Sequence, residues 1–222
     1  MRELVLDTET TGLDPGNGHR VVEIAAIELF NHLPTGRFYH TYINPERDMP
    51  EAAEAIHGLS ASFLERHPLF AAVAQEFLDF IAADPLVIHN AEFDLGFINA
   101  ELKRINLPKL TSPVVDTLTM ARRRFPGQSA SLDALCRRFA IDLGKREKHG
   151  AHIDGELLAA VYLELIGGRQ PGFDLANVKV AGAGLNAAAR DVRPARPHTA
   201  SPDELAAHAA FLAKIKQPIW QN

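Results

Sequence analysis

Two acidic residues, Asp7 and Glu9, end the first apolar segment of the chain and precede a Thr-Thr-Gly turn. If this segment is a strand, residues two apart point to the same side, so both carboxylates project together from the end of a sheet. Two unpaired carboxylates this close repel each other, at a cost on the order of a few kcal/mol in partly desolvated surroundings. A divalent cation or a shared proton between them would stabilise the pair. On its own, the pair is explained equally well by one carboxylate capping the turn.

Three further residues could take part in the same chemistry. Asp94 lies in the first turn of a predicted helix that begins directly after a short apolar strand, where ligand sites of α/β sheets gather. His149 and Asp154 lie five residues apart at the start of another predicted helix, His149 on a glycine-containing lead-in and Asp154 on the helix itself. Each position has an ordinary structural explanation, since an acid in the first helical turn stabilises the helix dipole. Together with the first pair, they indicate one acidic site with a histidine beside it.

The elements that must position these residues form an α/β pattern. The first third of the chain is rich in β-branched and aromatic residues separated by Gly/Pro/Asn turns, which predicts three strands in an antiparallel meander. Those strands are expected at 2–7, 21–30 and 37–43, with turns at 14–18 and 33–36. Later the apolar period becomes helical, and short strands at 86–88 and 114–115 alternate with helices. These helices are expected at 70–81, 93–102, 117–124, 131–139 and 152–166. The predicted fold is a mixed sheet of about five strands with helices on both faces.

Charge and cysteine content limit the classes of function. Residues 1–175 contain 17 Lys and Arg against 25 Asp and Glu, whereas residues 176–222 contain 6 against 3. A protein that binds duplex DNA through a broad basic face has the opposite balance, so cations must mediate much of any contact with nucleic acid. The single cysteine, Cys136, excludes an internal disulfide and a thiolate-rich zinc site, and is interpreted as a small core residue. We find no signal peptide and no apolar run long enough for a membrane span, which predicts a cytoplasmic protein without a membrane partner.

Three motifs, in this order, resemble those of the DEDDh (DnaQ-like) exonuclease superfamily. They are Asp7-x-Glu9, Phe93-Asp94 within His-Asn-x-x-Phe-Asp, and His149-x4-Asp154. Further matches make residues 3–168 closely similar to the epsilon proofreading subunits of bacterial DNA polymerase III; they are Thr10-Thr11-Gly12, Ile56-His57-Gly58, Val115-Asp116-Thr117 and Ser131-Leu132-Asp133-Ala134-Leu135-Cys136. The resemblance implies a ribonuclease H-like fold. It also implies a metal-dependent 3′→5′ exonuclease that removes nucleoside 5′-monophosphates from DNA 3′ ends.

The resemblance further implies a role for each motif residue. Asp7, Glu9 and Asp154 would hold one metal ion, and Asp7 would bridge to a second ion that Asp94 supports through water. Ligands that are all oxygen favour a hard cation, Mg²⁺ or Mn²⁺. Such metal pairs lie about 3.5–4 Å apart and stabilise the attacking and leaving oxygens of the phosphoryl displacement. His149 would accept the proton of the attacking water, because an unperturbed imidazole pKa of about 6.5 suits that step near neutral pH.

Contacts with the substrate are expected from the carboxylates and from one more segment. Asp7, Glu9 and Asp154 are expected to contact the substrate as well as the metal ions. His57 resembles the histidine that contacts the terminal nucleotide in the family, with a purely structural histidine as the alternative. Glu51 lies in the same segment, where this chain has one more position than the family pattern.

Three nearby residues and one run of arginines are predicted to be structural. Asn90 and Asp116 each precede a predicted helix and are interpreted as caps. Phe93 is expected in the core, with stacking on a base as the alternative. The run Arg122-Arg123-Arg124 is interpreted as a solvated face, with contact to the incoming strand as the alternative.

After Gly167-Gly168 the composition changes and suggests partner-binding segments. The resulting division is an exonuclease domain (1–168), a candidate clamp-binding peptide (169–175), a flexible linker (176–200) and a helical tail (201–222). Gln170–Leu175 resembles a sliding-clamp peptide, although so short a pattern also occurs by chance. Ser201-Pro202-Asp203-Glu204 has the signature of a helix start. The tail resembles the region by which epsilon subunits bind the polymerase alpha subunit, with a frayed terminus as the alternative.

Two other functions remain open at this point. The first is an RNA exonuclease on the same fold, similar to ribonuclease T or oligoribonuclease; those enzymes are compact dimers without a long tail, so the tail favours a replisome subunit. The second is a non-catalytic scaffold that only stabilises a polymerase. The presence of all five motif residues, from Asp7 to Asp154, argues against the scaffold.

Overall fold

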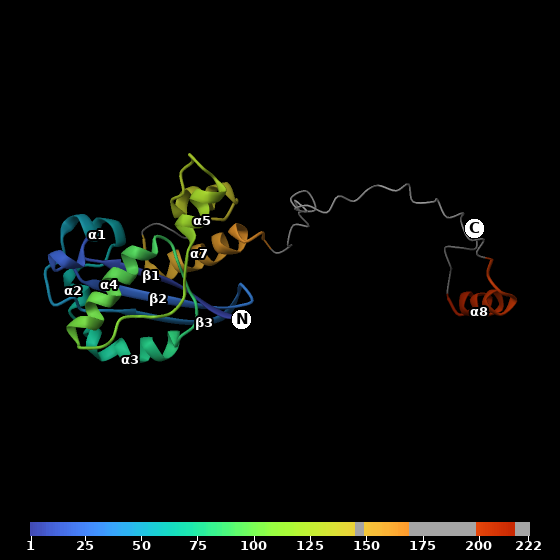
Figure 1. Ribbon diagram of the computed structural model, residues 1–222, viewed down its shortest axis with the longest axis horizontal. Coiled ribbons are helices and arrows are strands. Elements are labelled where there is room, and N and C mark those ends of the chain that lie inside the picture. The colour runs from blue at the N-terminus through green and yellow to red at the C-terminus, as the bar shows by residue number, and fades with distance from the viewer. Residues whose placement is uncertain (145–148, 169–198, 216–222) are drawn as a thin grey trace, which may run out of the picture. The chain divides into compact units, whose positions relative to one another are not determined.

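The computed structural model describes residues 1–144, 149–168 and 199–215, and its main feature is one mixed five-stranded sheet (Figure 1). The strand order is β3-β2-β1-β4-β5. β1, β2 and β3 pair antiparallel, while β4 and β5 run parallel to β1. The bounds are β1 (Arg2–Thr10), β2 (Val21–Phe30), β3 (Leu33–Tyr42), β4 (Leu86–Ile88) and β5 (Val114–Asp116). The predicted meander and the predicted fold class are confirmed.

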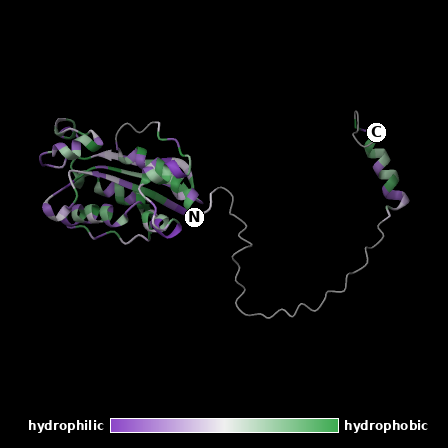
Figure 2. Cartoon of the chain, turned by 90° about the horizontal axis from the view of Figure 1, so that it is seen from above, coloured by the Kyte–Doolittle hydropathy of each residue, from purple (hydrophilic) through white to green (hydrophobic). Residues whose placement is uncertain are grey.

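Helices connect the strands and cover the sheet. They are η1 (Pro15–Asn17), α1 (Glu51–His57), α2 (Ala61–Leu64), α3 (Phe70–Ile81), α4 (Ala91–Arg104), α5 (Thr117–Arg124), α6 (Leu132–Arg138) and α7 (Ala151–Leu165). The apolar stripe predicted for the segment 70–81 is buried at Phe70, Val73, Phe77 and Ile81, which explains why this segment is helical. Figure 2 shows the same alternation of hydrophobic and hydrophilic residues along the helices.

Side chains of β1 point alternately to the two faces of the sheet, so the strand contributes to two layers of the core. Leu4 and Leu6 point to one face and pack with α3 and α4, in a cluster that includes Phe77 and Phe97. Val5 points to the opposite face and packs with Leu158 of α7. Because the period of a strand is two, the residues that follow Val5 in the same phase must also face α7. This phase places Asp7 and Glu9 on the α7 side and Thr8 on the α4 side.

Two boundaries differ from the sequence prediction. β1 continues beyond Asp7 to Thr10, so Asp7 and Glu9 lie within the paired strand, with an irregularity in the β1–β2 register between Glu9 and Thr10. The turn predicted at 33–36 is wrong, because Leu33 already pairs with Phe30 and the turn is formed by Asn31 and His32. Both turn residues have positive φ, 50° and 67°, as the tightest hairpins require.

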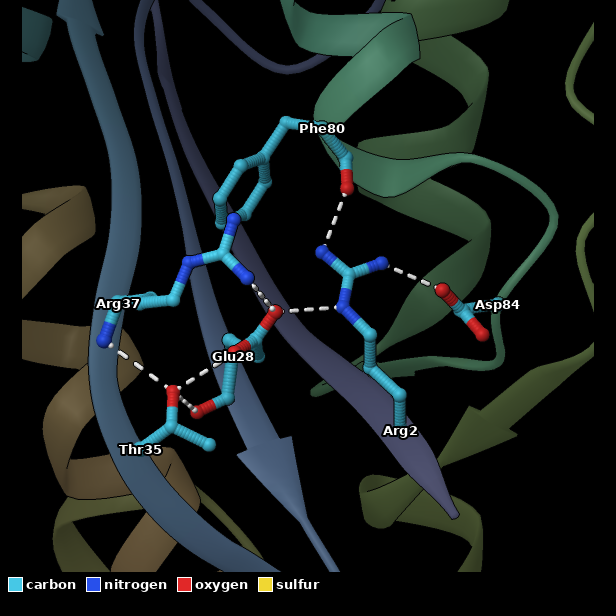
Figure 3. Close-up of polar contacts among 6 residues, drawn as sticks. All are labelled: Arg2, Glu28, Thr35, Arg37, Phe80 and Asp84. Carbon is cyan, nitrogen blue, oxygen red and sulfur yellow. Dashed lines mark hydrogen bonds and ion pairs between the residues drawn. The ribbon is translucent and has the colours of Figure 1, made fainter.

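An arginine network fastens the start of β1, at the end of the sheet away from Glu9. Arg2 contacts Glu28 on β2 through Nε at 2.5 Å, forms an ion pair with Asp84, and donates to the carbonyl of Phe80 at the end of α3 (Figure 3). Arg37 of β3 adds a contact of 3.2 Å to the same Glu28 carboxylate. This network joins three strands and α3 without taking part in the site described below.

A second unit contains one described helix, α8 (Pro202–Leu212). Ser201 and Glu204 form the predicted capping box, in which each side chain accepts from the other residue's backbone N–H. The candidate clamp peptide 169–175, residues 176–198 of the predicted linker and residues 216–222 of the tail lie outside the described residues. Among the residues that are described, no helix is long and apolar enough to cross a membrane.

Candidate active site and metal centre

Glu9, His149 and Asp154 converge beside β1 on the α7 face. One ligand atom from each side chain lies within 4.8 Å of the corresponding atoms of the other two. Asp154 occupies the first turn of α7 and is 4% exposed, so its carboxylate is held in a nearly dry environment. The helix can approach the sheet closely here because its next residue is Gly155, where an added Cβ would lie 3.1 Å from Cδ1 of Ile27. Sequence analysis predicted these three residues for one site, and the fold brings them together.

His149 is held between α1 and α7. Its backbone N–H donates to the carbonyl of Ile56 at 3.2 Å, and its Nδ1 lies 3.2 Å from Oδ2 of Asp154. About half of the imidazole surface stays exposed. The contact with Asp154 therefore orients the ring, which is partly exposed to solvent.

Asp94 lies on the opposite face of β1, where its carboxylate contacts the side chain of Thr8. Asp94 lies in the first turn of α4, is 3% exposed, and accepts a hydrogen bond of 2.7 Å from Oγ1 of Thr8. Burial raises the pKa of Asp94 to about 7, and the hydrogen bond from Thr8 opposes that rise. A carboxylate in this position is costly to ionise unless a positive charge lies close by.

Asp7 joins the two halves of the site. Burial raises the pKa of Asp7 well above its ordinary value, and the charges of Asp94, Glu9 and Asp154 raise it further. The four carboxylates predicted as metal ligands thus repel each other in the metal-free protein. A divalent cation neutralises such a cluster directly, and oxygen donors with one imidazole suit a hard ion. The donor set therefore fits a divalent metal centre.

A fifth acid, Glu23, was missed by sequence analysis. It lies on β2 directly opposite Glu9, is 3% exposed, and its Oε1 lies 2.7 Å from Nε2 of His40. Its charge also raises the pKa of Asp7. The signal for it is an acid in the middle of the apolar run Val21–Ile27, where an exposed position is not expected. Thr8, which holds Asp94, was missed as well.

A cavity of about 530 Å³ opens next to Glu9. Its lining is polar near β1 and apolar toward α1 and α4, and includes Thr8, Glu9, Thr10, Leu13, His19, Ala52, Ile56, His57 and Phe93. His57 ends α1, is buried, and accepts at Nδ1 from the N–H of Leu59 at 3.0 Å. Glu51 begins the same helix, is exposed, and is not among the lining residues. The structure therefore brings His57, but not Glu51, to the cavity.

The three residues predicted to be structural differ in outcome. Asp116 caps α5 as predicted, by accepting from the N–H groups of Leu118 and Thr119. The prediction for Asn90 is wrong: its side chain makes no capping bond, and it adopts a left-handed conformation with φ of 71°. Phe93 is partly buried in the core, packs on Phe97 and also lines the cavity beside Glu9.

Comparison with known protein families gives a specific match. The family model described as Exonuclease (RNase T) matches residues 4–162. The DNA polymerase III subunit epsilon of Rickettsia felis is 54% identical over 184 residues, which cover 81% of this chain and 80% of the relative. The Escherichia coli K12 protein of the same name is 42% identical over 229 residues, covering 97% of this chain and 94% of the relative.

Solved structures support the same fold. The nuclease domain of 3′hExo, described as a DEDDh family member bound to rAMP, superposes with a TM-score of 0.63 at 17% identity, covering 74% of this chain and 91% of that chain. Exonuclease X in complex with 5′ overhanging duplex DNA superposes with a TM-score of 0.58 at 24% identity, covering 74% of this chain and 90% of that chain.

Proposed function

The chain belongs to the exonuclease family and, within it, to the DNA polymerase III epsilon subunits, and from this premise we propose how it cleaves DNA and which partners direct it. It is a 3′→5′ exonuclease of the proofreading type. The observation that carries the proposed mechanism is the convergence of Glu9, His149 and Asp154 on one side of β1, with Asp94 buried on the other side.

The carboxylates form the metal centre in this proposal. Asp7, Glu9 and Asp154 would hold one divalent cation, and Asp7 and Asp94 would support a second, Mg²⁺ or Mn²⁺ in each case. The raised pKa values of Asp7 and Asp94 support this assignment, because they mean that both carboxylates are costly to ionise when no cation is bound. When bound, such ions polarise the scissile phosphate and stabilise charge on the attacking and leaving oxygens.

His149 is the general base. Its Nδ1 faces Asp154, so Nε2 is the nitrogen that accepts the proton from the attacking water. The contact with Asp154 orients the ring, and the hydrogen bond from the His149 backbone to Ile56 fixes the segment that carries it. Attack of the water oxygen on the terminal phosphorus breaks the bond to the 3′ oxygen of the preceding nucleotide, so a nucleoside 5′-monophosphate is released and the 3′ oxygen takes a proton from solvent to leave a 3′-hydroxyl.

The 3′-terminal nucleoside occupies the cavity beside Glu9. Its lining places apolar side chains, Ile56 and Phe93 among them, next to the acidic site, as a base and a sugar phosphate together require. His57 contacts this nucleotide, and the ions that Asp7, Glu9 and Asp154 would hold would bring its phosphate to these carboxylates. Glu51 was expected here from the resemblance, and its exposed position at the start of α1 gives that expectation no support.

The C-terminal segments bind the partners. Residues 201–222 bind the polymerase alpha subunit, and Gln170–Leu175 binds the sliding clamp. The names of the relatives support a place within DNA polymerase III, and with it a cytoplasmic location. α8 supports the first contact, because it begins with a complete capping box and leaves Leu205 and Phe211 58% and 61% exposed.

The test is release of mononucleotides from the 3′ end of matched DNA and RNA oligonucleotides, with Mg²⁺, with Mn²⁺ and with a chelator. The proposal predicts metal-dependent release from single-stranded DNA at a higher rate than from RNA, and its loss in Asp7→Ala. Exposed Asp48 provides a matched control, since Asp48→Ala removes the same charge at a residue that does not line the cavity beside Glu9 and should keep full activity. Equal or faster cleavage of RNA would favour the ribonuclease alternative, and metal-independent activity would overturn the mechanism.

A further inference from the structure

A second cavity, of about 490 Å³, opens where β4 and β5 end. One wall is His89, the residue after β4, and the other is formed by Leu118 and Arg122 of α5. The segment 128–132, which leads into α6, closes the third side. His89 begins the motif His-Asn-x-x-Phe-Asp, and Ser131 and Leu132 belong to another matched segment, but none of the lining residues is a proposed metal ligand or lines the cavity beside Glu9.

The position of this cavity relative to the site follows from the sheet. β1, β4 and β5 are parallel neighbours, so their carboxyl ends lie at the same edge as Asp7 and Glu9. Adjacent strands are about 4.8 Å apart, which puts the end of β5 roughly 10 Å from β1. A nucleic acid strand rises about 3.4 Å per nucleotide when stacked, so this distance corresponds to a few nucleotides upstream of the scissile bond.

The charge around the cavity is opposite to that of the rest of the domain. Residues 117–139 contain five arginines and one acid, Asp133, within a region of 175 residues in which acids outnumber basic residues by 25 to 17. Two of the arginines have structural partners: Arg124 donates to carbonyls at the end of α7, and Arg138 stacks over the ring of Phe125 at 4.1 Å. Arg122 lines the cavity and is exposed.

The remaining lining is neutral and able to donate hydrogen bonds. Burial lowers the pKa of His89 and the charge of Arg122 acts in the same direction, while the charge of Asp116 and a hydrogen bond with the backbone of Ala130 oppose that shift. Nδ1 of His89 lies 2.9 Å from Oγ1 of Thr117, which fixes the ring. Gln128 and Ser129 are exposed on the opposite wall. One cation among neutral donors suits a singly charged phosphodiester.

We propose that this cavity binds a backbone phosphate of the single strand upstream of the scissile bond, with Arg122 supplying the charge. The proposal rests on the exonuclease function given above and adds a strand-guiding site to it. It gives a domain of negative net charge one local surface on which a polyanion can approach the carboxylates. Because the contact is to phosphate, it holds the strand without selecting its sequence.

The experiment compares two substrates that differ in whether upstream phosphates exist. One is a single-stranded oligothymidylate, and the other is the p-nitrophenyl ester of thymidine 5′-monophosphate, which has only the phosphate to be cleaved. For Arg122→Ala in the full chain, kcat/KM on the oligonucleotide should fall about fivefold, mainly through KM, while the ester is cleaved as by wild type. The slope of log kcat/KM against log salt should also decrease in magnitude by about 0.7, the value for one phosphate contact on a single strand.

Arg104→Ala is the matched control. Arg104 is an exposed arginine at the far end of α4, about 20 Å along the helix from its start at the site edge.

A loss in Arg122→Ala no greater than in Arg104→Ala would overturn the proposal, and so would an equal loss on both substrates. An intact oligonucleotide rate together with weaker binding to the polymerase subunit would instead assign the surface to a protein partner and overturn it too. Failure of the wild type to cleave either substrate would refute the exonuclease function itself, which is a separate outcome.

Discussion

Asp94→Asn should stabilise the metal-free protein near pH 8 while it weakens cation binding. The carboxylate is 3% exposed, and burial raises its pKa from 3.8 to about 7. One pKa unit corresponds to about 1.4 kcal/mol, so ionisation of Asp94 near pH 8 costs the folded state as much as about 4 kcal/mol relative to the unfolded chain. Asparagine has nearly the same shape, and its carbonyl oxygen can still accept from Thr8. The variant therefore avoids most of this cost.

The sign of the pH dependence follows from the same shift. Because the pKa of Asp94 is higher in the folded state, that state binds more protons between the two pKa values, and the metal-free wild type becomes more stable as the pH falls through about 7. At about pH 5 the cost shrinks to under about 2 kcal/mol, so the advantage of Asp94→Asn should shrink by about half or more.

Urea unfolding of chelator-treated protein near pH 5 and pH 8 measures this difference. Asp48→Asn is the control, since Asp48 is exposed and its charge should not matter at either pH. Addition of Mn²⁺ should narrow the difference near pH 8, because wild type gains about 2.7 kcal/mol at a metal concentration one hundred times its Kd and the variant gains less. A variant that is equally destabilised at both pH values would refute the idea that Asp94 is an uncompensated buried acid.

Three further predictions address the base, the scaffold and the tail. His149→Ala should lose a hundredfold or more of kcat, roughly what a general base contributes, while Mn²⁺ and single-stranded DNA still bind by calorimetry; full activity would end its assignment as the base. Glu101→Ala breaks a buried bidentate pair with Arg20, with contacts of 2.6 and 2.8 Å, and should cost about 3–5 kcal/mol in urea unfolding; a loss below about 1 kcal/mol would mean that water replaces the carboxylate. Deletion of 176–222 should preserve nuclease activity and abolish association with the polymerase subunit; co-elution of the truncated chain with that subunit on gel filtration would refute the role of the tail.

The residues of the site could be predicted from sequence because their spacing reflects the fold. An acid pair two apart on a strand, and acids in the first turns of two helices, must meet if those elements belong to one sheet edge. Asp94 and Asp154 are both buried in the structure, as ligands within a site must be. Residue spacing does not indicate on which face of the sheet each side chain lies. In the structure, Thr8 and Asp94 lie on one face of β1, and Glu9 and Asp154 lie on the other.

The errors in the prediction have definite physical reasons. Leu33-Pro34-Thr35-Gly36 reads as a turn by composition, but β3 is an edge strand, where a proline need not donate to a neighbour. The actual turn at Asn31 and His32 needs positive φ at both residues, and histidine is not a typical residue there. Glu23 escaped notice because its carboxylate is compensated by His40, which is 17 residues away and adjacent only once β2 and β3 pair.

The negative charge of the acidic site explains why phosphodiester cleavage and binding of the DNA strand require different parts of the chain. The carboxylates proposed to hold cations cannot themselves attract DNA, and burial together with their mutual repulsion already raises the pKa of Asp7. Phosphate contacts must therefore come from elsewhere, and Arg122 of α5 lines the cavity at the ends of β4 and β5. A single contact of this kind gives weak affinity, because a surface charge pair contributes at most about 1 kcal/mol. Such an enzyme cleaves efficiently only where a partner holds a frayed 3′ end close to it, as the proposed binding of residues 201–222 to a polymerase would do.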